Sequence, residues 1–579
     1  MRTFTNEITI ACNFNAIDDK YDFYQLRTLD KYIPKGSKVL DLGLDGIRSI
    51  AFDDGASLFA MFEKNSCKNY ELNQAVGENI MVKKISSELI KPYIIAKLFL
   101  YSLANSNHSD CSFSNLSGKL YLFRPEWIGK TRKTFKALNI DIKSHNGNTA
   151  KLTCNACSFS SIKLFKSPKV LETYPRYEFS IKGTLKRTFE KDCASYVRKA
   201  PNGKKAEIPF ISFFDNEMCL CKSSIMLETI KSFNKQFDGL ISLNQCSKEI
   251  VRKIDSKRDE MFFEKIVILL ADKDIYLSNY DKNSEDGEYF NQLVQKIEEL
   301  LPFSNIIVSK EIKSKALNVV LIHNQNYYIE NDLNDPYATF DRSTPIQCVT
   351  AEDACSKNDK AIYKTIIKEL QIKNEIINER KILIDDWKTY NHTSSWIFGV
   401  LIEDTSYFMN ISCDGTFKLI KKASPFSTYK EEIYDKLEKY LLSYKGEDRR
   451  IFADDKGNIN LIVDAAIIPL PHANLFESNS PRGKESKVNN LCGILDINVY
   501  NDSDLMRYSV GPVGKTVNKR IPTAPHIYEI RVLSGEQKML DIIETLGVQF
   551  VKYNSYTVVP YPFKYLSEYV LMCKKKELL

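Results

Sequence analysis

Short apolar runs separated by polar turns fill the first 110 residues of the chain. Four of these runs have the length of strands, and a fifth is long enough for a helix. The strand candidates are residues 7–12, 37–42, 47–52 and 57–62, and the helix candidate is residues 86–103. The pattern predicts an α+β segment at the start of the chain.

Strands and amphipathic helices alternate between residues 256 and 390. The apolar positions predict one helix, at 287–301, and three strands, at 265–270, 305–308 and 317–323. This alternation is typical of a doubly wound α/β domain, in which ligands bind beyond the carboxyl ends of the strands. Gln347 lies on a further short strand, and we expect it at that edge of the sheet.

The helix after Gln347 is predicted from four apolar residues that share one face: Ile362, Ile366, Ile367 and Leu370. Lys373 ends this helix, where a positive charge suits the negative end of the helix dipole. A β-meander is predicted next, with strands from Trp396 to Ile402, up to Cys413 and up to Ile420, and an Asp414-Gly415 turn. Farther along the chain, helices are predicted at 428–442 and 536–546, and strands at 460–468 and 526–532.

Length and charge narrow the class of protein. A chain of 579 residues can bury three or four cores. The formal charge of +7 is modest for that length, so nucleic-acid binding would depend on local basic patches. No apolar run reaches membrane-spanning length, and the first residues are too polar for a signal peptide. We therefore expect a cytoplasmic protein without membrane contact.

The 14 cysteines mostly stand alone, as buried thiols do in reduced compartments. Cys154 and Cys157, with Cys219 and Cys221, are the one set that could ligate zinc. The Cys-x-Cys spacing of the second pair is unusual for such a site, so ordinary strand cysteines are the favoured interpretation.

Basic and aromatic residues occur together after Lys119. Cations at this density can neutralise phosphates, and aromatic rings can stack on bases. A solvated surface explains the same composition equally well. The backbone-binding candidates in these clusters and in a later Gly-Pro-rich loop are Lys130, Arg132, Lys133, Lys186, Arg187, Lys515, Lys519 and Arg520.

Gln347 and Lys373, in that order and at that separation, resemble the MID-to-PIWI junction of a prokaryotic Argonaute. In that family the corresponding Gln and Lys reach the 5′ phosphate of a guide strand. The family's upstream Tyr and Lys would fall near Leu333 and Tyr337, where this chain has only a displaced tyrosine. The resemblance therefore implies a 5′-phosphate site made of Gln347, Lys373, Tyr337 and Arg342.

The resemblance implies an α/β multidomain fold with a Rossmann-like MID domain and an RNase H-like PIWI domain, preceded by α+β N-terminal and linker domains. The segment between 165 and 208 is too short for a complete PAZ domain. The implied boundaries are an N-like domain at 1–110, a first linker at 111–165, a second linker with PAZ absent or reduced at 166–255, MID at 256–390 and PIWI at 391–579.

Catalysis in an RNase H-like fold needs several carboxylates that bind two divalent metals. The first strand of the meander carries Gly399, Val400, Leu401 and Ile402 at the position where the first acid is expected, and acids appear only at Glu403 and Asp404. We therefore expect no catalytic residues, no enzyme activity and no resident metal, with Mg²⁺ at the guide's 5′ phosphate as the one candidate cofactor.

The resemblance, taken to the DdmE-like Argonautes of plasmid defence, implies an inactive protein that binds a short guide, DNA more readily than RNA. It would recognise complementary plasmid DNA and recruit a helicase-nuclease partner. Three alternatives stay open. Asp404 and Asp464, assisted by Asp414 or Asp455, could form a degenerate nuclease site. Asp454 and Asp455 resemble the paired aspartates of a polymerase palm. The fold could also be a protein scaffold without nucleic acid.

Overall fold

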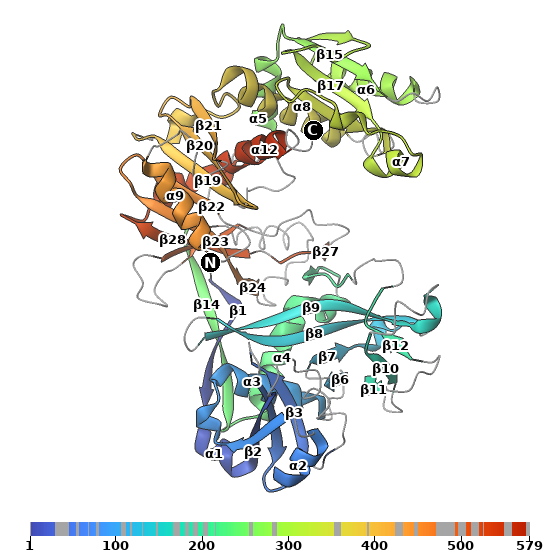
Figure 1. The fold of residues 1–579 in the computed structure, drawn as a ribbon, viewed down its shortest axis with the longest axis vertical. Helices are drawn as coiled ribbons and strands as arrows, with labels where there is room; N and C mark the ends of the chain where they lie inside the picture. Colours follow the sequence, from blue (N-terminus) through green and yellow to red (C-terminus); the bar gives the residue numbers. More distant parts are fainter. Residues whose placement is uncertain are drawn as a thin grey trace. The chain divides into compact units, whose positions relative to one another are not determined.

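The chain folds as a mixed α/β protein, as the sequence predicts, and it divides into two compact units (Figure 1). Unit 1 comprises Met1–Glu249, Ile467–Asn490 and Thr516–Ala524, and unit 2 comprises Ile250–Ala466, Leu491–Lys515 and Pro525–Leu579. None of the described helices is long and apolar enough to cross a membrane. The computed structural model describes residues 2–574 except 29–43, 45, 54–56, 68, 77–79, 106–111, 116–118, 130, 132, 146–148, 166–173, 180–184, 189–194, 201–206, 215, 254–258, 281–286, 353–359, 391–392, 423–431, 445–449, 471–492, 496–504, 511–519, 525 and 549–558.

Unit 1 begins with a four-stranded antiparallel sheet of order β3-β4-β2-β5. Its strands are β2 (Tyr21–Thr28), β3 (Ile47–Phe52), β4 (Ser57–Glu63) and β5 (Ile80–Ile85). The strands predicted at 47–52 and 57–62 are confirmed, whereas residues 37–42 lie outside the described part. The predicted helix at 86–103 begins later, as α3 (Pro92–Ser102), because Pro92 favours the first position of a helix.

Two long strands, β8 (Thr134–Ser144) and β9 (Thr149–Ser161), form a hairpin that β7 (Leu120–Phe123) and β6 (Ser112–Asn115) extend. The aromatic residues that the sequence offered for base stacking, Tyr121, Phe123 and Phe135, are buried here. The rings of Phe135 and Phe159 stack with centroids 5.2 Å apart, inside a small core. These three aromatic side chains therefore stabilise the sheet, and they form neither a surface for base stacking nor a solvated face, the two interpretations that the sequence left open.

Strand β1 (Arg2–Cys12) joins distant parts of unit 1, because it pairs with β14 (Ile241–Lys253), β9 and β24 (Pro469–Leu470). A bulge interrupts its pairing with β14 between Phe4 and Ile8. Buried Asn6 lies within this bulge. Its amide donates to the Leu152 carbonyl at 3.0 Å and accepts from the Ile468 N–H at 2.8 Å.

The next residue of the bulge, Glu7, is fully buried among charged neighbours. Its carboxylate lies 3.5 Å from the Lys248 ammonium, which is also fully buried, and 3.5 Å from the His145 ring. A buried carboxylate of this kind depends on its cation, because desolvation of a lone charge costs several kcal/mol.

Unit 2 begins with a four-stranded parallel sheet of order β16-β15-β17-β18, which confirms the doubly wound prediction. The strands are β15 (Asp274–Asn279), β16 (Asn305–Val308), β17 (Leu317–Ile322) and β18 (Ile346–Thr350), and helices α6 (Gly287–Leu300) and α8 (Lys360–Asn374) pack with them. The strand predicted at 265–270 is wrong, since these residues belong to helix α5 (Asp259–Leu269) and the turn after it. Phe262, Ile266 and Leu270 recur at the spacing of one helix face and are buried.

The second sheet of unit 2 contains the predicted meander, β19 (Trp396–Ile402), β20 (Thr405–Ile411) and β21 (Phe417–Lys422). On the other side of β19 follow β22 (Arg450–Asp454) and β23 (Ile459–Ile467), each antiparallel to its neighbour. Strand β26 (Leu505–Val510) pairs with β28 (His526–Ser534), and the helix predicted at 428–442 is α9 (Glu432–Ser443). The helix predicted at 536–546 is only two short pieces, α11 (Met539–Ile542) and a 3₁₀ turn at Ile543–Gly547.

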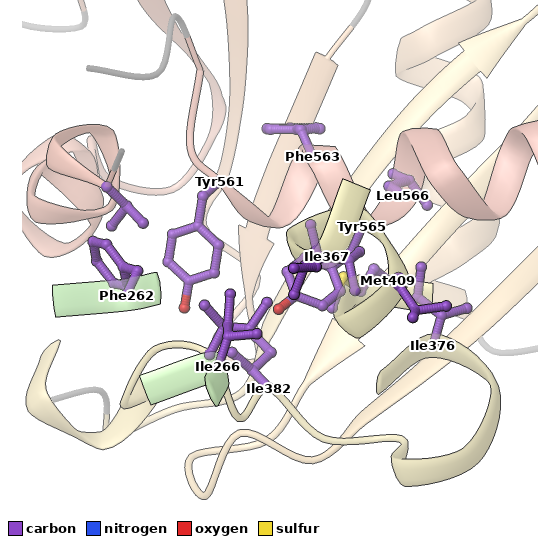
Figure 2. Packing of buried hydrophobic residues seen from close by; sticks show 14 of the residues in the cluster. Phe262, Ile266, Ile367, Ile376, Ile382, Met409, Tyr561, Phe563, Tyr565 and Leu566 are labelled. Carbon is purple, nitrogen blue, oxygen red and sulfur yellow. The ribbon is translucent and has the colours of Figure 1, made fainter. Parts of the chain in front are cut away.

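Helix α12 (Pro562–Lys574) and the turn before it pack into one core with the parallel sheet's helices and the meander. Figure 2 shows Tyr561, Phe563, Tyr565 and Leu566 close to Ile367 and Ile376 of the α8 region and to Met409 of β20. The Tyr565 hydroxyl donates to buried Glu375 at 2.7 Å, directly after α8. The last described helix therefore fixes the parallel-sheet part of unit 2 to the meander.

We predict that Lys248→Met destabilises unit 1 by about 3–5 kcal/mol, because the substitution leaves the buried Glu7 carboxylate without its ammonium. The double variant Glu7→Leu/Lys248→Met removes both charges and should recover most of that loss. Urea unfolding followed by circular dichroism measures both effects. The exposed Lys235→Met is the matched control, and equal midpoints for Lys248→Met and this control would contradict the prediction.

Candidate functional site

Gln347 and Lys373 lie side by side in unit 2. The Lys373 ammonium donates to the Gln347 Oε1 at 2.7 Å and to the Ile346 carbonyl at 2.9 Å. Gln347 is the second residue of β18 and Lys373 lies in the last turn of α8. The pair therefore lies at the amino end of β18, and the expectation of the carboxyl end is wrong. A helix that follows a parallel strand runs back along it, so its last turn returns to the start of that strand.

Both the nitrogen and the oxygen of the Gln347 side-chain amide are hydrogen-bonded to protein groups. Its Nε2 donates to the Glu369 carboxylate at 2.9 Å, while its Oε1 accepts from Lys373. Glu369 precedes Lys373 by one helical turn, so a single amide bridges a carboxylate and an ammonium on the same helix. Gln347 acts here as a positioning residue for Lys373.

A small, open pocket lies next to this pair, and the space of about 380 Å³ at this pocket includes open solvent. Lys373 lines it, whereas Gln347 does not. An ammonium has three N–H donors, and two of them are held by Gln347 and Ile346. Among the described residues no other group accepts from this ammonium, so one donor is left for a ligand in the pocket. The other lining residues are Tyr337, Asp341, Arg342, Thr344, Ile346, Ile377, Glu568, Leu571 and Met572.

Tyr337 and Arg342 form another part of the lining. The Arg342 guanidinium lies over the Tyr337 ring, 4.2 Å from its centroid, and donates to the Tyr337 carbonyl at 2.5 Å. Burial raises the pKa of Tyr337, and the charge of Arg342 opposes that rise. The phenol therefore stays protonated at neutral pH. The structure brings together all four residues of the implied 5′-phosphate site, with Gln347 behind the pocket wall.

The charges around Lys373 nearly balance. Burial lowers the pKa of Lys373, while nearby Glu568 and Glu369 favour its charged form. Lys564 of α12 contacts both acids, with its Nζ 2.7 Å from Glu568 and 3.5 Å from Glu369. Burial lowers the pKa of Lys564, but these two carboxylates outweigh burial and raise the pKa above its ordinary value. Sequence reasoning missed Lys564, Glu568 and Glu369. Its only signal for two of them was the i,i+4 spacing of Lys564 and Glu568 on the last helix.

The oxygen ligands that the pocket offers do not form a Mg²⁺ site by themselves. Glu568 already accepts from Lys564, and Asp341 accepts from the Ser343 N–H and hydroxyl. Octahedral Mg²⁺ needs about six oxygens. The chemistry of the pocket is therefore that of cations, an aromatic ring and two carboxylates.

The acids of the alternative nuclease and polymerase sites either hold turns or are exposed. Among described residues, no three His, Cys, Asp or Glu side chains cluster as metal ligands would. Glu403 and Asp404 are exposed in the β19–β20 turn, and Asp464 is exposed on β23, where the His526 Nδ1 lies 2.7 Å from it. Three further acids hold loop backbone. Asp414 accepts from the Thr416 N–H, Asp454 from the Asn458 N–H and Asp455 from the Ser395 N–H.

The middle of β19 has no room for an acid. A Cβ added at Gly399 would lie 2.7 Å from the Phe408 ring and 2.9 Å from the Ile451 side chain. Phe398, Val400 and Leu401 are buried. The strand is therefore packed tightly along its centre.

Among the described residues, the four cysteines considered as zinc ligands belong to no cluster of three or more potential metal ligands. Burial raises the pKa of Cys154 and of Cys157 to about 12 each, so both are thiols at neutral pH in the metal-free chain. Cys221 is buried and Cys219 is exposed.

The backbone-binding candidates have varied surroundings. Lys133 is exposed, and the backbones of Lys186 and Arg187 lie in β11 (Leu185–Thr188). The Arg520 guanidinium forms a bidentate pair with Glu217, with Nε to Oε2 at 2.6 Å, and lies over the Phe214 ring. This pairing neutralises Arg520 within unit 1. Four candidates lie outside the described residues: Lys130, Arg132, Lys515 and Lys519.

Comparison with known proteins finds no matching family model and no match among curated proteins. Among solved structures, the chain resembles prokaryotic Argonautes. The Marinitoga piezophila Argonaute in complex with 5′ OH guide RNA is 12% identical, with a TM-score of 0.48 and 98% of each chain covered. The Clostridium butyricum Argonaute bound to a guide DNA and a 19-mer target DNA is 10% identical, with a TM-score of 0.45 and coverage of 99% of this chain and 98% of that one. The Aquifex aeolicus Argonaute is 10% identical, with a TM-score of 0.38 and coverage of 98% and 97%.

We predict that Gly399→Ala destabilises the protein by about 1–3 kcal/mol, because the added methyl group overpacks the strand against Phe408 and Ile451. Thermal unfolding measures the loss. Gly287→Ala is the matched control, because a Cβ at Gly287 meets no atom within 4 Å. A Gly399→Ala variant as stable as this control would show that the centre of β19 can accept a side chain.

Proposed function

We propose that this protein binds the 5′ end of a short guide strand in the pocket beside Lys373 and uses the guide to recognise complementary nucleic acid. The observation that carries the proposal is the contact between Gln347 and Lys373 at the wall of an open pocket. A helix-borne ammonium, held by an amide and still with one free donor, suits a terminal phosphate group.

Arg342 and Tyr337 complete this proposal. The guanidinium presents planar donors that match phosphate oxygens, and the ring beneath it holds its orientation. Tyr337 also offers an aromatic surface at the pocket, on which the first base of the strand could stack. Sequence specificity would come from base pairing, with phosphate contacts fixing only the position of the guide.

The proposal includes catalytic inactivity. Two-metal cleavage needs carboxylates held together, and a buried apolar strand occupies the position where the resemblance expects the first of them. The acids that the alternative sites would use instead hold turns (Asp414, Asp454 and Asp455) or are exposed (Asp404 and Asp464).

A guide-binding protein that does not cut needs a separate effector. From the sequence resemblance alone, we propose that the target is plasmid DNA, that the guide is DNA and that the effector is a helicase-nuclease. No metal is assigned a role in this proposal.

We expect short nucleic-acid strands to copurify with the protein or to bind it on addition, with their 5′ ends in the pocket. Lys373→Met should weaken binding of a 5′-phosphorylated DNA oligonucleotide by about tenfold or more, because it removes a charge-assisted contact. Fluorescence anisotropy measures the affinity, and end-labelling identifies copurified strands. The matched control is Lys310→Met, an exposed lysine of the same unit outside the pocket.

Two results would contradict the proposal. Equal affinities for Lys373→Met and Lys310→Met would place the strand elsewhere. No binding of any DNA or RNA strand would favour a protein scaffold.

We expect the guide-loaded protein to leave labelled complementary target intact in Mg²⁺ or Mn²⁺. Denaturing gel electrophoresis detects cleavage. A guide-dependent product that Asp404→Ala abolishes would show instead that the protein is a nuclease.

A further inference from the structure

Helix α12 contributes a buried acid to the pocket. The Glu568 side chain is 9% exposed, lines the pocket and accepts from Lys564, one turn earlier on the same helix, at 2.7 Å. A carboxylate is an unexpected neighbour for a site that receives an anion, because like charges in a partly buried site repel strongly.

Among the residues that the structure describes, the formal charges at the pocket cancel. Two cations, Arg342 and Lys373, and two carboxylates, Asp341 and Glu568, line it. Behind them Lys564 contacts both Glu568 and Glu369, which adds one charge of each sign. A terminal phosphate brings a charge of about −1.5 to −2 at neutral pH. It therefore enters a pocket with no net positive charge, and its attraction to Lys373 and Arg342 is opposed by Glu568.

A hydroxyl end fits the same groups without this opposition. It can accept from the remaining N–H of Lys373 and donate to a carboxylate such as Glu568, because a hydroxyl is both donor and acceptor. The apolar side chains of Ile346, Ile377, Leu571 and Met572 complete the lining and carry no charge that favours either end.

We propose that Glu568 is a specificity-determining residue that limits the preference of the pocket for a 5′ phosphate over a 5′ hydroxyl, an inference that rests on the proposed guide binding. Lys564 sets the strength of this effect by neutralising part of the charge of Glu568. The ligand class is therefore the 5′ end of a short strand in either chemical form.

The experiment compares one short DNA oligonucleotide with a 5′ phosphate or a 5′ hydroxyl, titrated into the full chain by fluorescence anisotropy. The buffer contains EDTA, so that no divalent cation neutralises Glu568. The measured quantity is the ratio of the hydroxyl Kd to the phosphate Kd. For the wild type we expect a ratio of only a few-fold, about threefold or less.

Glu568→Gln keeps the size of the side chain and an acceptor for Lys564 while removing the charge. We expect it to raise the ratio by about tenfold, through tighter binding of the phosphorylated strand. Lys564→Met is the opposing variant. It leaves the charge of Glu568 less neutralised, so the ratio should fall below that of the wild type. Opposite shifts from two neighbours on one helix separate charge from general disruption, and thermal unfolding checks that each variant is folded.

The inference is overturned if Glu568→Gln leaves the ratio within about twofold of wild type. It is also overturned if both variants shift the ratio in the same direction. In both cases the strand still binds, so the proposed function stands. If neither form of the strand binds wild-type protein, the proposed function fails, and this inference fails with it.

Discussion

Burial of helix α12 is the constraint on which unit 2 depends. Phe563, Leu566 and Val570 recur on one face of this helix and enter the core shared by the parallel sheet's helices and the meander. Glu568, Leu571 and Met572 lie on a neighbouring face and line the pocket. A large buried side chain contributes about 1.5–3 kcal/mol. The same hydrophobic packing that stabilises the fold therefore sets the position of the pocket wall.

Glu375, directly after α8, strengthens the attachment of α12 through a hydrogen bond from Tyr565. Its carboxylate accepts from the Leu383 and Ile384 N–H groups, from Gln371 and from Tyr565 of α12. Burial raises the pKa of Glu375 to about 7, against the effect of these four donors. The backbone widens into a π-helix at Glu375–Glu379 and ends at Arg380 in the left-handed region. Since Lys373 lies only two residues earlier, the buried acid also fixes the end of α8 that carries the pocket ammonium.

Local patterns predicted much of the fold. The Asp414-Gly415 turn, the apolar face of α8 and the meander follow from rules that act over a few residues. The pairing of Gln347 with Lys373 was expected from the resemblance to Argonautes and not from a local pattern, and the pattern alone placed Gln347 at the wrong end of its strand. The prediction of a strand at 265–270 was wrong because a short apolar run fits either a strand or a helix. Only the spacing of apolar residues from Phe262 to Leu270 distinguishes the helix from the strand.

Contacts between residues far apart in the chain could not be predicted from local sequence patterns. Lys564 and Glu369 meet although 195 residues separate them, and no local pattern marks such a pair. The aromatic residues near Lys119 have a composition that suits either base stacking or a core. Their burial is decided by pairing of β7, β8 and β9, which depends on the whole sheet. The order of strands beside β19 was likewise not predictable from local patterns, because β19 pairs with β22 as well as with its neighbour in sequence, β20.

The bridge made by Asn6 has a consequence for synthesis of the chain. Its amide oxygen accepts from Ile468, 462 residues later, and β1 completes its pairing only with β24. At roughly 5–20 residues per second, a ribosome needs on the order of half a minute or more to make the intervening segment. The first strand therefore emerges long before one of its partners exists. Until then its polar bulge must be hydrated or shielded by a chaperone, and unit 1 reaches its final form only after Ile467–Asn490 and Thr516–Ala524 have been made.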